Sequence, residues 1–364
     1  MTELPTMREP RSGRRIVADD AAPPTDWDER AVTVPGGHVM QSATWGRYRA
    51  TQGFEPRYLT FDDDRVVLVL LRRTRGLPGV EASVRRGPAH AGEAGPAAAA
   101  RASALAAWAT QVGARDLYLD PERPADPAYA TAMEAAGFRT SEGIEPSIHV
   151  MRLDFGSGVD PDGLWERLSK STRQRIRAAE RVGTSVAEDR SGDRLDAFAL
   201  LLQQRAEIVG MQLQQGTHYL RGWRALMAAG LGRLLVADHE GELVGGLFIF
   251  RHGGIHATAY SADLASRRRE LPGTMHLVRW TAICEALAEG CPAIELGGVD
   301  LPGRRTPPRP GDPNRGLYEH KRGFGAEWVE REPPRRIVLR PAAERLAHFR
   351  RRTVDALRGV RRWR

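Results

Sequence analysis

Three strand-like segments in a row, each ended by a turn, constrain the fold of this sequence more than any other feature. They span residues 232–239, 245–252 and 255–262, and glycines lie in both turns between them. Short segments of this kind predict an antiparallel meander. Two helices are expected before the meander, and a helix and a strand after it, at residues 194–209, 219–229, 275–289 and 293–296.

This order of a helix pair, a meander, a helix and a strand resembles acyltransferases of the GNAT type. The first half of the sequence shows a degraded version of the same order. Its expected strands and helices lie at residues 55–61, 65–73, 97–112, 116–119, 129–136 and 148–153. A chain of 364 residues suits two domains of ordinary size. The sequence therefore predicts an α/β (α+β) fold of two tandem GNAT-like acyltransferase domains, without a coiled-coil insertion.

The two ends of the chain differ from the part between them. Residues 1–34 are rich in Pro, Arg and Asp without periodicity, which predicts a disordered segment. We expect the first domain at 35–153 with a returning strand at about 328–340, and the second domain at 154–327. Residues 341–364 carry apolar side chains at helical intervals with arginines between them, which predicts a basic amphipathic helix. Such a helix lies on anionic lipid or packs on the protein, and both interpretations stay open.

The formal net charge of +8 favours an anionic partner, such as nucleic acid, a phosphorylated lipid or a membrane surface. An arginine-rich composition also raises the charge without any partner. No apolar run approaches the ~20 residues of a membrane-spanning helix, and the first residues lack the apolar core of a signal peptide. Two cysteines exclude a disulfide framework and a thiol metal site. We therefore expect a cytoplasmic protein, with peripheral contact to the inner face of the plasma membrane left open.

Lysine is scarce in this chain. Of the 54 basic residues, only Lys170 and Lys321 are lysines. An ammonium group is compact and its pKa is adjustable, whereas a guanidinium group is planar and fixed in charge. A lysine in so arginine-rich a chain can mark a site that arginine cannot serve, although chance explains the same count.

The segment 267–275 bears on the cofactor. GNAT enzymes that use acetyl-CoA carry Q/R-x-x-G-x-G/A here, where glycines and a helix N-terminus bind the pyrophosphate. This segment reads RRRELPGTM, with one glycine and a proline. We therefore expect neither CoA nor another cofactor.

Five segments occur in the order found in one family of transferases. They are Gln41–Trp45 (QSATW), Gly137–Pro146, Leu168–Gly183, Glu295–Asp300 (ELGGVD) and Gly316–Gly325 (GLYEHKRGFG). Over residues 38–339 this ordered set resembles the Fem-type (FemA/FemB/FemX) peptidyltransferases. The resemblance implies twin GNAT-like domains, an aminoacyl-tRNA donor and a lipid-linked muropeptide acceptor, which is lipid II or its nucleotide precursor. The implied reaction adds an amino acid to the stem-peptide amine of the peptidoglycan precursor, which forms the interpeptide bridge.

The resemblance also implies roles for single residues. Lys321 matches the lysine that stabilises the transition state, and Arg49 matches a basic residue that contacts the phosphates of the precursor. Tyr219 and Tyr260 fall near the acceptor-site tyrosines, but the basic residue expected shortly before the first of them is missing. His320 is a further departure, because an aromatic residue often precedes this lysine. His320 and Asp300, which ends the ELGGVD segment, are candidate substrate contacts, with packing as the alternative for the histidine.

Lys170, Arg173 and Arg177 lie at positions i, i+3 and i+7 of a helix expected within residues 162–182, so they share one side of it. They are candidate contacts to tRNA phosphates. A solvated helix face explains the same row of charges.

Peptide formation from aminoacyl-tRNA is aminolysis of an activated ester, so the enzyme mainly has to orient the reactants. One donor at the developing oxyanion contributes on the order of 3 kcal/mol, and Lys321 is the candidate for it. The other histidines, His276 among them, show no metal-ligand spacing and are interpreted as structural. Two further functions stay open. They are a GNAT-type acyltransferase of polysaccharide or peptide-antibiotic biosynthesis, and a non-catalytic RNA- or membrane-binding protein.

Overall fold

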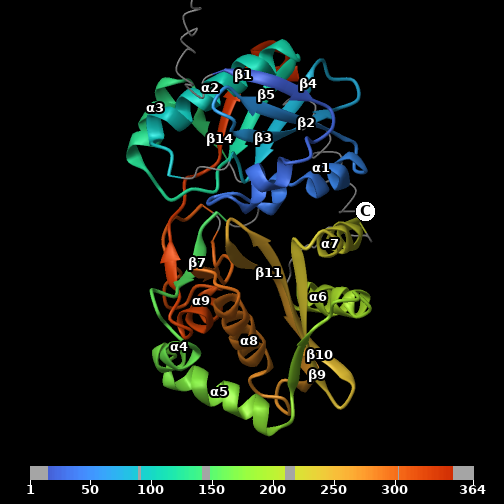
Figure 1. Ribbon diagram of the computed structural model, residues 1–364, viewed down its shortest axis with the longest axis vertical. Coiled ribbons are helices and arrows are strands. Elements are labelled where there is room, and N and C mark those ends of the chain that lie inside the picture. The colour runs from blue at the N-terminus through green and yellow to red at the C-terminus, as the bar shows by residue number, and fades with distance from the viewer. Residues whose placement is uncertain (1–14, 89–91, 142–147, 210–217, 302, 347–364) are drawn as a thin grey trace, which may run out of the picture. The chain divides into compact units, whose positions relative to one another are not determined.

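The computed structural model describes residues 15–88, 92–141, 148–209, 218–301 and 303–346 (Figure 1). The chain forms two compact units. Unit 1 comprises residues 1–32, 36–144 and 333–364, and unit 2 comprises residues 33–35 and 145–332. In the described part of the chain, no helix is long and apolar enough to cross a membrane.

Unit 1 has a mixed sheet with seven strands among its described residues. From edge to edge they are β1 (Ile16–Asp20), β2 (Phe54–Phe61), β3 (Val66–Arg73), β4 (Val80–Arg85), β5 (Ala114–Asp120), β14 (Arg335–Val338) and β6 (Arg139–Thr140). Only β4 and β5 are parallel neighbours. Helix α1 (Ala43–Ala50) contacts β2 and β3, α2 (Gly95–Gln111) packs on β5, and α3 (Pro127–Ala135) packs on α2. The strands and helices predicted for the first half are therefore present.

The prediction of disorder for residues 1–34 is wrong from residue 15 onward, while residues 1–14 lie outside the described residues. Strand β1 pairs antiparallel with β2. Trp27 is completely buried, and its Nε1 donates a hydrogen bond to the carbonyl oxygen of Gln41 at 2.7 Å. A strand of five residues has too little periodicity to be recognised in a polar segment, and here the pairing with β2 stabilises it. Trp27 in turn packs on Tyr58 of β2.

Unit 2 has a second sheet, again with seven strands among the described residues. Their order is β13 (Glu327–Val329), β7 (Val150–Asp154), β12 (Ala293–Glu295), β11 (Ile255–Asp263), β10 (Glu242–His252), β9 (Gly232–His239) and β8 (Ser185–Glu188). Strands β9, β10 and β11 are antiparallel, so the predicted meander is confirmed. Strands β11 and β12 run parallel and pair over only two residues each.

The helices of unit 2 cover both faces of this sheet. They are α4 (Pro161–Arg167), α5 (Lys170–Arg181), α6 (Leu195–Val209), α7 (His218–Ala228), α8 (Thr274–Ala288) and α9 (Arg315–Arg322). Helices α6 and α7 lie on one face of the meander and α8 lies on the other (Figure 1). Helix α8 has apolar side chains on its buried face, among them Val278, Ala282 and Ile283, and these enter the core of unit 2.

The single strand expected near the C-terminal end of the fold is divided between the two sheets. Strand β13 pairs with β7 in unit 2, and β14 pairs with β5 and β6 in unit 1. Pro333 and Pro334 lie between them, and proline cannot donate to a strand ladder. The expected first domain, with residues 35–153 and about 328–340, thus contains β7 and β13, which belong to the sheet of unit 2. Residues 341–346 are helical, and the rest of the predicted basic helix lies outside the described residues.

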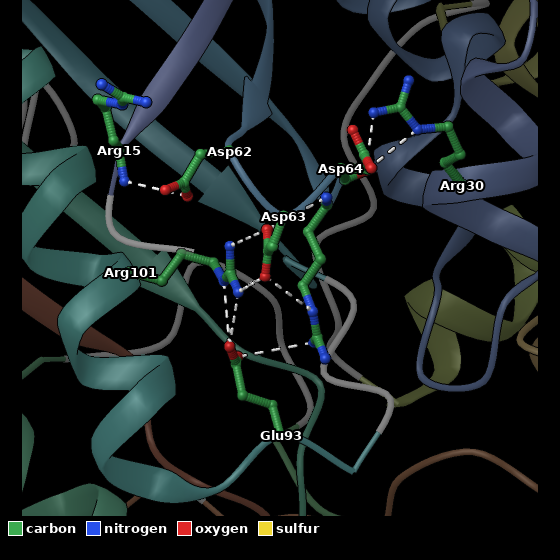
Figure 2. A network of polar contacts seen from close by, with 8 residues as sticks. Arg15, Arg30, Asp62, Asp63, Asp64, Glu93 and Arg101 are labelled. Atoms are coloured by element: carbon green, nitrogen blue, oxygen red, sulfur yellow. Dashed lines mark hydrogen bonds and ion pairs between the residues drawn. The ribbon is translucent and has the colours of Figure 1, made fainter. Parts of the chain in front are cut away.

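The turn between β2 and β3, residues 62–64, is anchored by arginines (Figure 2). Arg101 of α2 is 2% exposed and donates to both carboxylate oxygens of Asp63, at 3.1 and 2.7 Å, and to Glu93 at 2.7 Å. Arg30 donates to the carbonyl oxygen of the last aspartate of the turn at 2.7 Å. This network therefore fixes the turn against α2 and acts as a structural element.

Candidate active site

Lys321 lies in α9 and is 3% exposed, so its side chain is buried. Its Nζ donates a hydrogen bond to the carbonyl oxygen of Gly298 at 2.7 Å. The neighbouring Gly297 has a φ of 76°, and a Cβ there would lie 3.0 Å from the carbonyl oxygen of Thr258 and 3.4 Å from Nζ. A glycine is therefore needed here for the close approach between the segment after β12, strand β11 and the lysine.

Asp300 organises the chain around this lysine. Its Oδ2 accepts hydrogen bonds from the backbone N–H groups of Ile148 and His149, at 2.6 and 3.1 Å. Its carbonyl oxygen accepts a hydrogen bond from Asn314 Nδ2 at 2.8 Å. The segments that lead into β7 and α9 are thus tied to the same residue. This anchoring role is what the structure shows for Asp300, and contact with substrate stays a prediction.

A hydrogen-bonded array lies beside the lysine and comes from α8, α9 and β11. Arg279 is 4% exposed, and its Nη1 and Nη2 contact His320 Nε2 at 3.1 Å and Ser261 Oγ at 3.2 Å. On its other side, His320 Nδ1 lies 3.1 Å from Nε2 of His276. We call these four residues, Ser261, Arg279, His320 and His276, the arginine–histidine array.

The proton positions in this array follow from the arginine. A guanidinium group only donates, so His320 Nε2 must accept the hydrogen bond from Arg279. The neutral His320 ring then carries its proton on Nδ1 and donates to His276 Nε2. Burial, followed by the charges of Arg279, His276 and Lys321, lowers the pKa of His320 to about 2. Burial and the charges of Arg175 and Arg279 lower the pKa of His276 to about 4. Both rings are therefore neutral at pH 7.

The two basic residues of the site are buried without a carboxylate partner. Burial lowers the pKa of Arg279 to about 10, so this side chain stays charged at neutral pH. Burial and the charge of Arg279 lower the pKa of Lys321 well below its usual range, while Asp300 acts in the opposite direction. Among the described residues, no carboxylate forms an ion pair with Arg279 or Lys321. The site is thus electropositive and shielded from water.

The two predicted acceptor-site tyrosines are brought together around one tryptophan. The ring of Trp223 lies 4.9 Å from that of Tyr219 and 4.7 Å from that of Tyr260. Tyr260 faces α7 in this way, and the next residue, Ser261, contacts Arg279 of α8. Since α7 and α8 lie on opposite faces of the meander, the tyrosines and the array do not share a face (Figure 1).

Arg49 belongs to unit 1, where its guanidinium lies 4.1 Å from the ring centre of Phe54 and 5.7 Å from that of Trp45. It is half-buried against these rings. A cation held on aromatic faces keeps its charge while its orientation is fixed. This arrangement is compatible with the predicted contact to phosphate, which stays a prediction.

The three predicted tRNA contacts on α5 differ in their surroundings. Lys170 is exposed at the start of the helix. Arg173 donates to the carbonyl oxygens of Trp165 and Glu166, at 3.3 and 3.1 Å, and so ties α5 to the preceding helix. Arg177 is exposed and lies 5.3 Å from the ring centre of Trp165. Lys170 and Arg177 are therefore presented to solvent, whereas Arg173 is engaged in packing.

The sequence alone did not point to Arg279 as a site residue, and His276 was interpreted as structural. A signal was present, because these are the two polar members of an otherwise apolar stretch, MHLVRW, at positions i and i+3 of one helix. Their partner His320 comes from another helix, and that proximity is a property of the fold. In the described part of the chain, no group of three or more His, Cys, Asp or Glu residues could hold a metal ion.

The neutral histidines make the stability of unit 2 depend on pH. The folded pKa values of His276 and His320 lie below the unfolded value of about 6.5, so the unfolded chain binds more protons in acid. Their effect on the free energy of unfolding is therefore most favourable above pH 6.5. It is lost as the pH falls toward the folded pKa values, about 4 for His276 and about 2 for His320. At about 1.4 kcal/mol per pH unit, we expect each histidine to account for a loss of up to about 2 kcal/mol between pH 6.5 and 5.

The measurement is urea denaturation at pH 7.5 and pH 5, with His320→Phe as the comparison. Because buried His149 and His256 also have lowered pKa values, part of the acid sensitivity should remain in the variant. The difference between the two pH values should shrink by up to about 2 kcal/mol in His320→Phe. An unchanged difference would show that His320 is not neutral in the folded protein.

Comparison with known proteins identifies the fold around this site. Residues 167–322 match the family model of the acetyltransferase (GNAT) domain. No curated protein matches the sequence. The crystal structure of FemX is similar, with a TM-score of 0.75 at 18% identity over 91% of this chain and 99% of that chain.

Two further solved structures are similar at lower scores. A conserved protein of unknown function from Bacteroides thetaiotaomicron has a TM-score of 0.53 at 11% identity, over 87% of this chain and 98% of that one. The C-terminal domain (DUF2156) of a protein from Agrobacterium fabrum assigned as a lysylphosphatidylglycerol synthetase has a TM-score of 0.51 at 14% identity, over 84% and 91%. The predicted tandem GNAT-like domains and the resemblance to the Fem type are thus confirmed in the fold.

Proposed function

We propose that this chain is an aminoacyltransferase that uses aminoacyl-tRNA to add an amino acid to the stem-peptide amine of a lipid-linked peptidoglycan precursor. The observation that carries the proposal is Lys321, buried against Gly297 and Gly298 in a fold that matches FemX over nearly its whole length. The GNAT match of residues 167–322 supports acyl transfer as the class of reaction. Lipid II, or its nucleotide precursor, is the proposed acceptor.

The N-terminus of α8 supports a donor other than acetyl-CoA. A helix N-terminus binds pyrophosphate through open backbone N–H groups. Here α5 packs across it, because a Cβ at Gly273 would overlap the carbonyl oxygen of Arg175. Two of the three preceding arginines form ion pairs, Arg267 with Glu242 and Glu270, and Arg268 with Asp263, while Arg269 is exposed. This place therefore offers little room for a CoA pyrophosphate.

The chemistry required of Lys321 is modest, because the ester of aminoacyl-tRNA is already activated. A neutral amine attacks the ester carbonyl, and negative charge develops on its oxygen. An N–H donor fixed by the protein at that oxygen lowers the barrier by about 3 kcal/mol. Lys321 is fixed by its hydrogen bond to Gly298 and is shielded from water, which strengthens such an interaction.

The exposed cations of α5 suit the donor. Lys170, Arg175, Arg177 and Arg181 are exposed, and no ion pair to a carboxylate is found for any of them in the described part of the chain. We place tRNA phosphates on this helix. Both substrates imply action in the cytoplasm, and residues 341–364 are the proposed contact to the inner face of the plasma membrane.

The test is transfer of radiolabel to acceptor by the purified full-length chain. A mixed pool of labelled aminoacyl-tRNA is offered with lipid II, with phosphatidylglycerol in a second reaction, and labelled acetyl-CoA replaces the tRNA in a third. We expect label on lipid II from tRNA alone. Label on phosphatidylglycerol would instead identify a lipid-aminoacylating enzyme, and label from acetyl-CoA alone a GNAT enzyme of another pathway. No transfer at all would favour the non-catalytic RNA- or membrane-binding function.

A further inference from the structure

The site contains two buried basic side chains whose charges are not neutralised. Arg279 and Lys321 are 4% and 3% exposed. Among the described residues, Arg279 forms hydrogen bonds only to the neutral groups His320 and Ser261, and its Nε is buried without a hydrogen-bond partner. Within the same part of the chain, the hydrogen bond of Lys321 Nζ is to the carbonyl oxygen of Gly298. Arg279 contacts the residue that precedes Lys321, and its charge acts on the lysine. Two such buried positive charges are unfavourable, both because each has lost its water and because they repel each other.

One of the two must therefore give up its proton more readily, and the chemistry of the groups decides which. A guanidinium group keeps its proton in proteins, whereas a buried ammonium group releases it readily. The lowered pKa of Lys321, caused by burial and then by Arg279, has the direction that this argument requires. A neutral Lys321 has two N–H groups and a lone pair. The contact to Gly298 uses one N–H, which leaves one donor and the lone pair for chemistry.

The other charged groups around the lysine do not change the conclusion that Lys321, and not Arg279, loses its proton. On the strands near the site they are paired with one another: Arg152 with Asp154, Glu295 with Arg331, His256 with Glu289, and Asp263 with Arg268. On α8 and α9, His276 and His320 are neutral, and Arg322 is exposed to solvent. Asp300 favours a charged lysine, but its Oδ2 already accepts two backbone N–H bonds, which stabilise its own charge.

We propose that Arg279 is a positioning residue whose buried charge holds Lys321 as a neutral amine, so that Lys321 carries the proton of the transfer reaction. The inference rests on the proposed function for this last step. The attacking amine forms the new C–N bond and becomes an ammonium group. Its proton passes to the lone pair of Nζ, and the resulting ammonium of Lys321 lies beside the oxyanion. When the C–O bond to the ribose breaks, Nζ gives the proton to the leaving oxygen and is neutral again.

The arginine–histidine array explains how Arg279 is held in place. His320 Nε2 and Ser261 Oγ fix the two ends of the guanidinium group. His276 in turn fixes the His320 ring, whose tautomer leaves a lone pair toward the arginine. A phenylalanine at position 320 could fill the same space but could not accept this hydrogen bond. His320 is thus the residue that admits a buried arginine beside the lysine.

The scarcity of lysine gives a direct test that needs no substrate. In protein labelled with ¹³Cε-lysine, NMR should show two lysine signals, from Lys170 and Lys321, and Lys321→Met assigns them. The chemical shift of each signal reports the charge on its Nζ. We expect Lys321 to titrate clearly below the ordinary lysine value of about 10.4.

Variants then separate the charge of Arg279 from its packing. Arg279→Met and Arg279→Gln should move the titration of Lys321 upward, toward the ordinary lysine value of about 10.4, and Asp300→Asn should move it further down. Arg322→Met is the control, because it removes the charge of the residue that follows Lys321, and this side chain is exposed to solvent. It should leave the titration unchanged. Circular dichroism on the same samples shows whether each variant is folded.

Kinetics then test the proton-carrying step. For the wild type, kcat/KM should fall as the pH drops below the titration of Lys321, and in Arg279→Met this acid limb should move to higher pH, with activity regained in alkali. The inference would be overturned if Lys321 titrated at the ordinary lysine value of about 10.4, or if its titration did not change in Arg279→Met and Arg279→Gln. If the titrations are as expected but no amino acid is transferred to lipid II, the coupling of Arg279 to Lys321 stands. The proposed function is then refuted instead.

Discussion

Replacing Lys321 by methionine is expected to lower kcat for aminoacyl transfer by about 10²–10³-fold, which is the typical effect of losing one fixed donor or one proton carrier at a reacting centre. KM should change little, because the lysine acts on the charge that develops during the reaction. The fold should survive, since a methionine of similar length in place of a buried, unpaired basic group is often neutral for stability. Initial rates on lipid II with saturating aminoacyl-tRNA measure both constants.

Arg322→Met is the control for this experiment, because it removes a neighbouring charge that is exposed to solvent. It should keep kcat within about twofold, as expected for a surface substitution that leaves the fold unchanged. An equal loss in both variants would indicate disturbance of α9 rather than chemistry at Lys321. A full rate in Lys321→Met would remove this lysine from the reaction.

The positions of the helices and strands could be predicted from the sequence more fully than the pairing of the strands. The meander of β9, β10 and β11 was predicted because alternating strands and glycine turns are local signals. The two strands β7 and β13 carry no local sign of the sheet that they join, since pairing is a property of the whole fold. Strand β1 was missed for a related reason, because five residues are too few for periodicity to show.

In the candidate site, too, some features can be predicted from local sequence and others arise only from the whole fold. Lys321 was singled out from a motif and from the rarity of lysine, both of which can be read along the chain. Its burial, its contact to Gly298 and the effect of the Arg279 charge arise from α9, the segment after β12 and α8, which are separate in sequence. Electrostatic effects depend on such distances and on exposure to water, so no sequence pattern reports them.

Arg279 and Arg101 show that a buried arginine can either stabilise the fold or be unfavourable for it. Arg101 lies between two carboxylates, Asp63 and Glu93, and burial alone would lower its pKa, but these hydrogen bonds and charges raise it. Arg279 has no such partner in the described part of the chain. The first arrangement is what stability requires of a buried charge, whereas the second is unfavourable for the fold and suits a site where negative charge appears only during a reaction.

This contrast leads to the second large prediction. Arg101→Met should lower the free energy of unfolding by about 3–5 kcal/mol, because it removes the shortest contacts of two carboxylates. Asp63 then keeps the backbone N–H of Arg65 at 3.3 Å, and the guanidinium of Arg65 lies at 3.6 Å from Asp63 and 3.8 Å from Glu93. Arg279→Met should cost far less, since it removes a charge for which the described residues offer no carboxylate partner. Guanidinium denaturation followed by circular dichroism measures both variants.

Arg30→Met is the control in the same network (Figure 2), because Arg30 is less buried and its main contact is a backbone carbonyl at 2.7 Å. It should cost at most about 1 kcal/mol. A loss for Arg279→Met as large as that for Arg101→Met would mean that both arginines are structural, and the electrostatic role of Arg279 would then lose its main support. The predicted order, with Arg101 far above Arg279 and Arg30, therefore tests the distinction between a charge that holds the fold and one kept for the reaction.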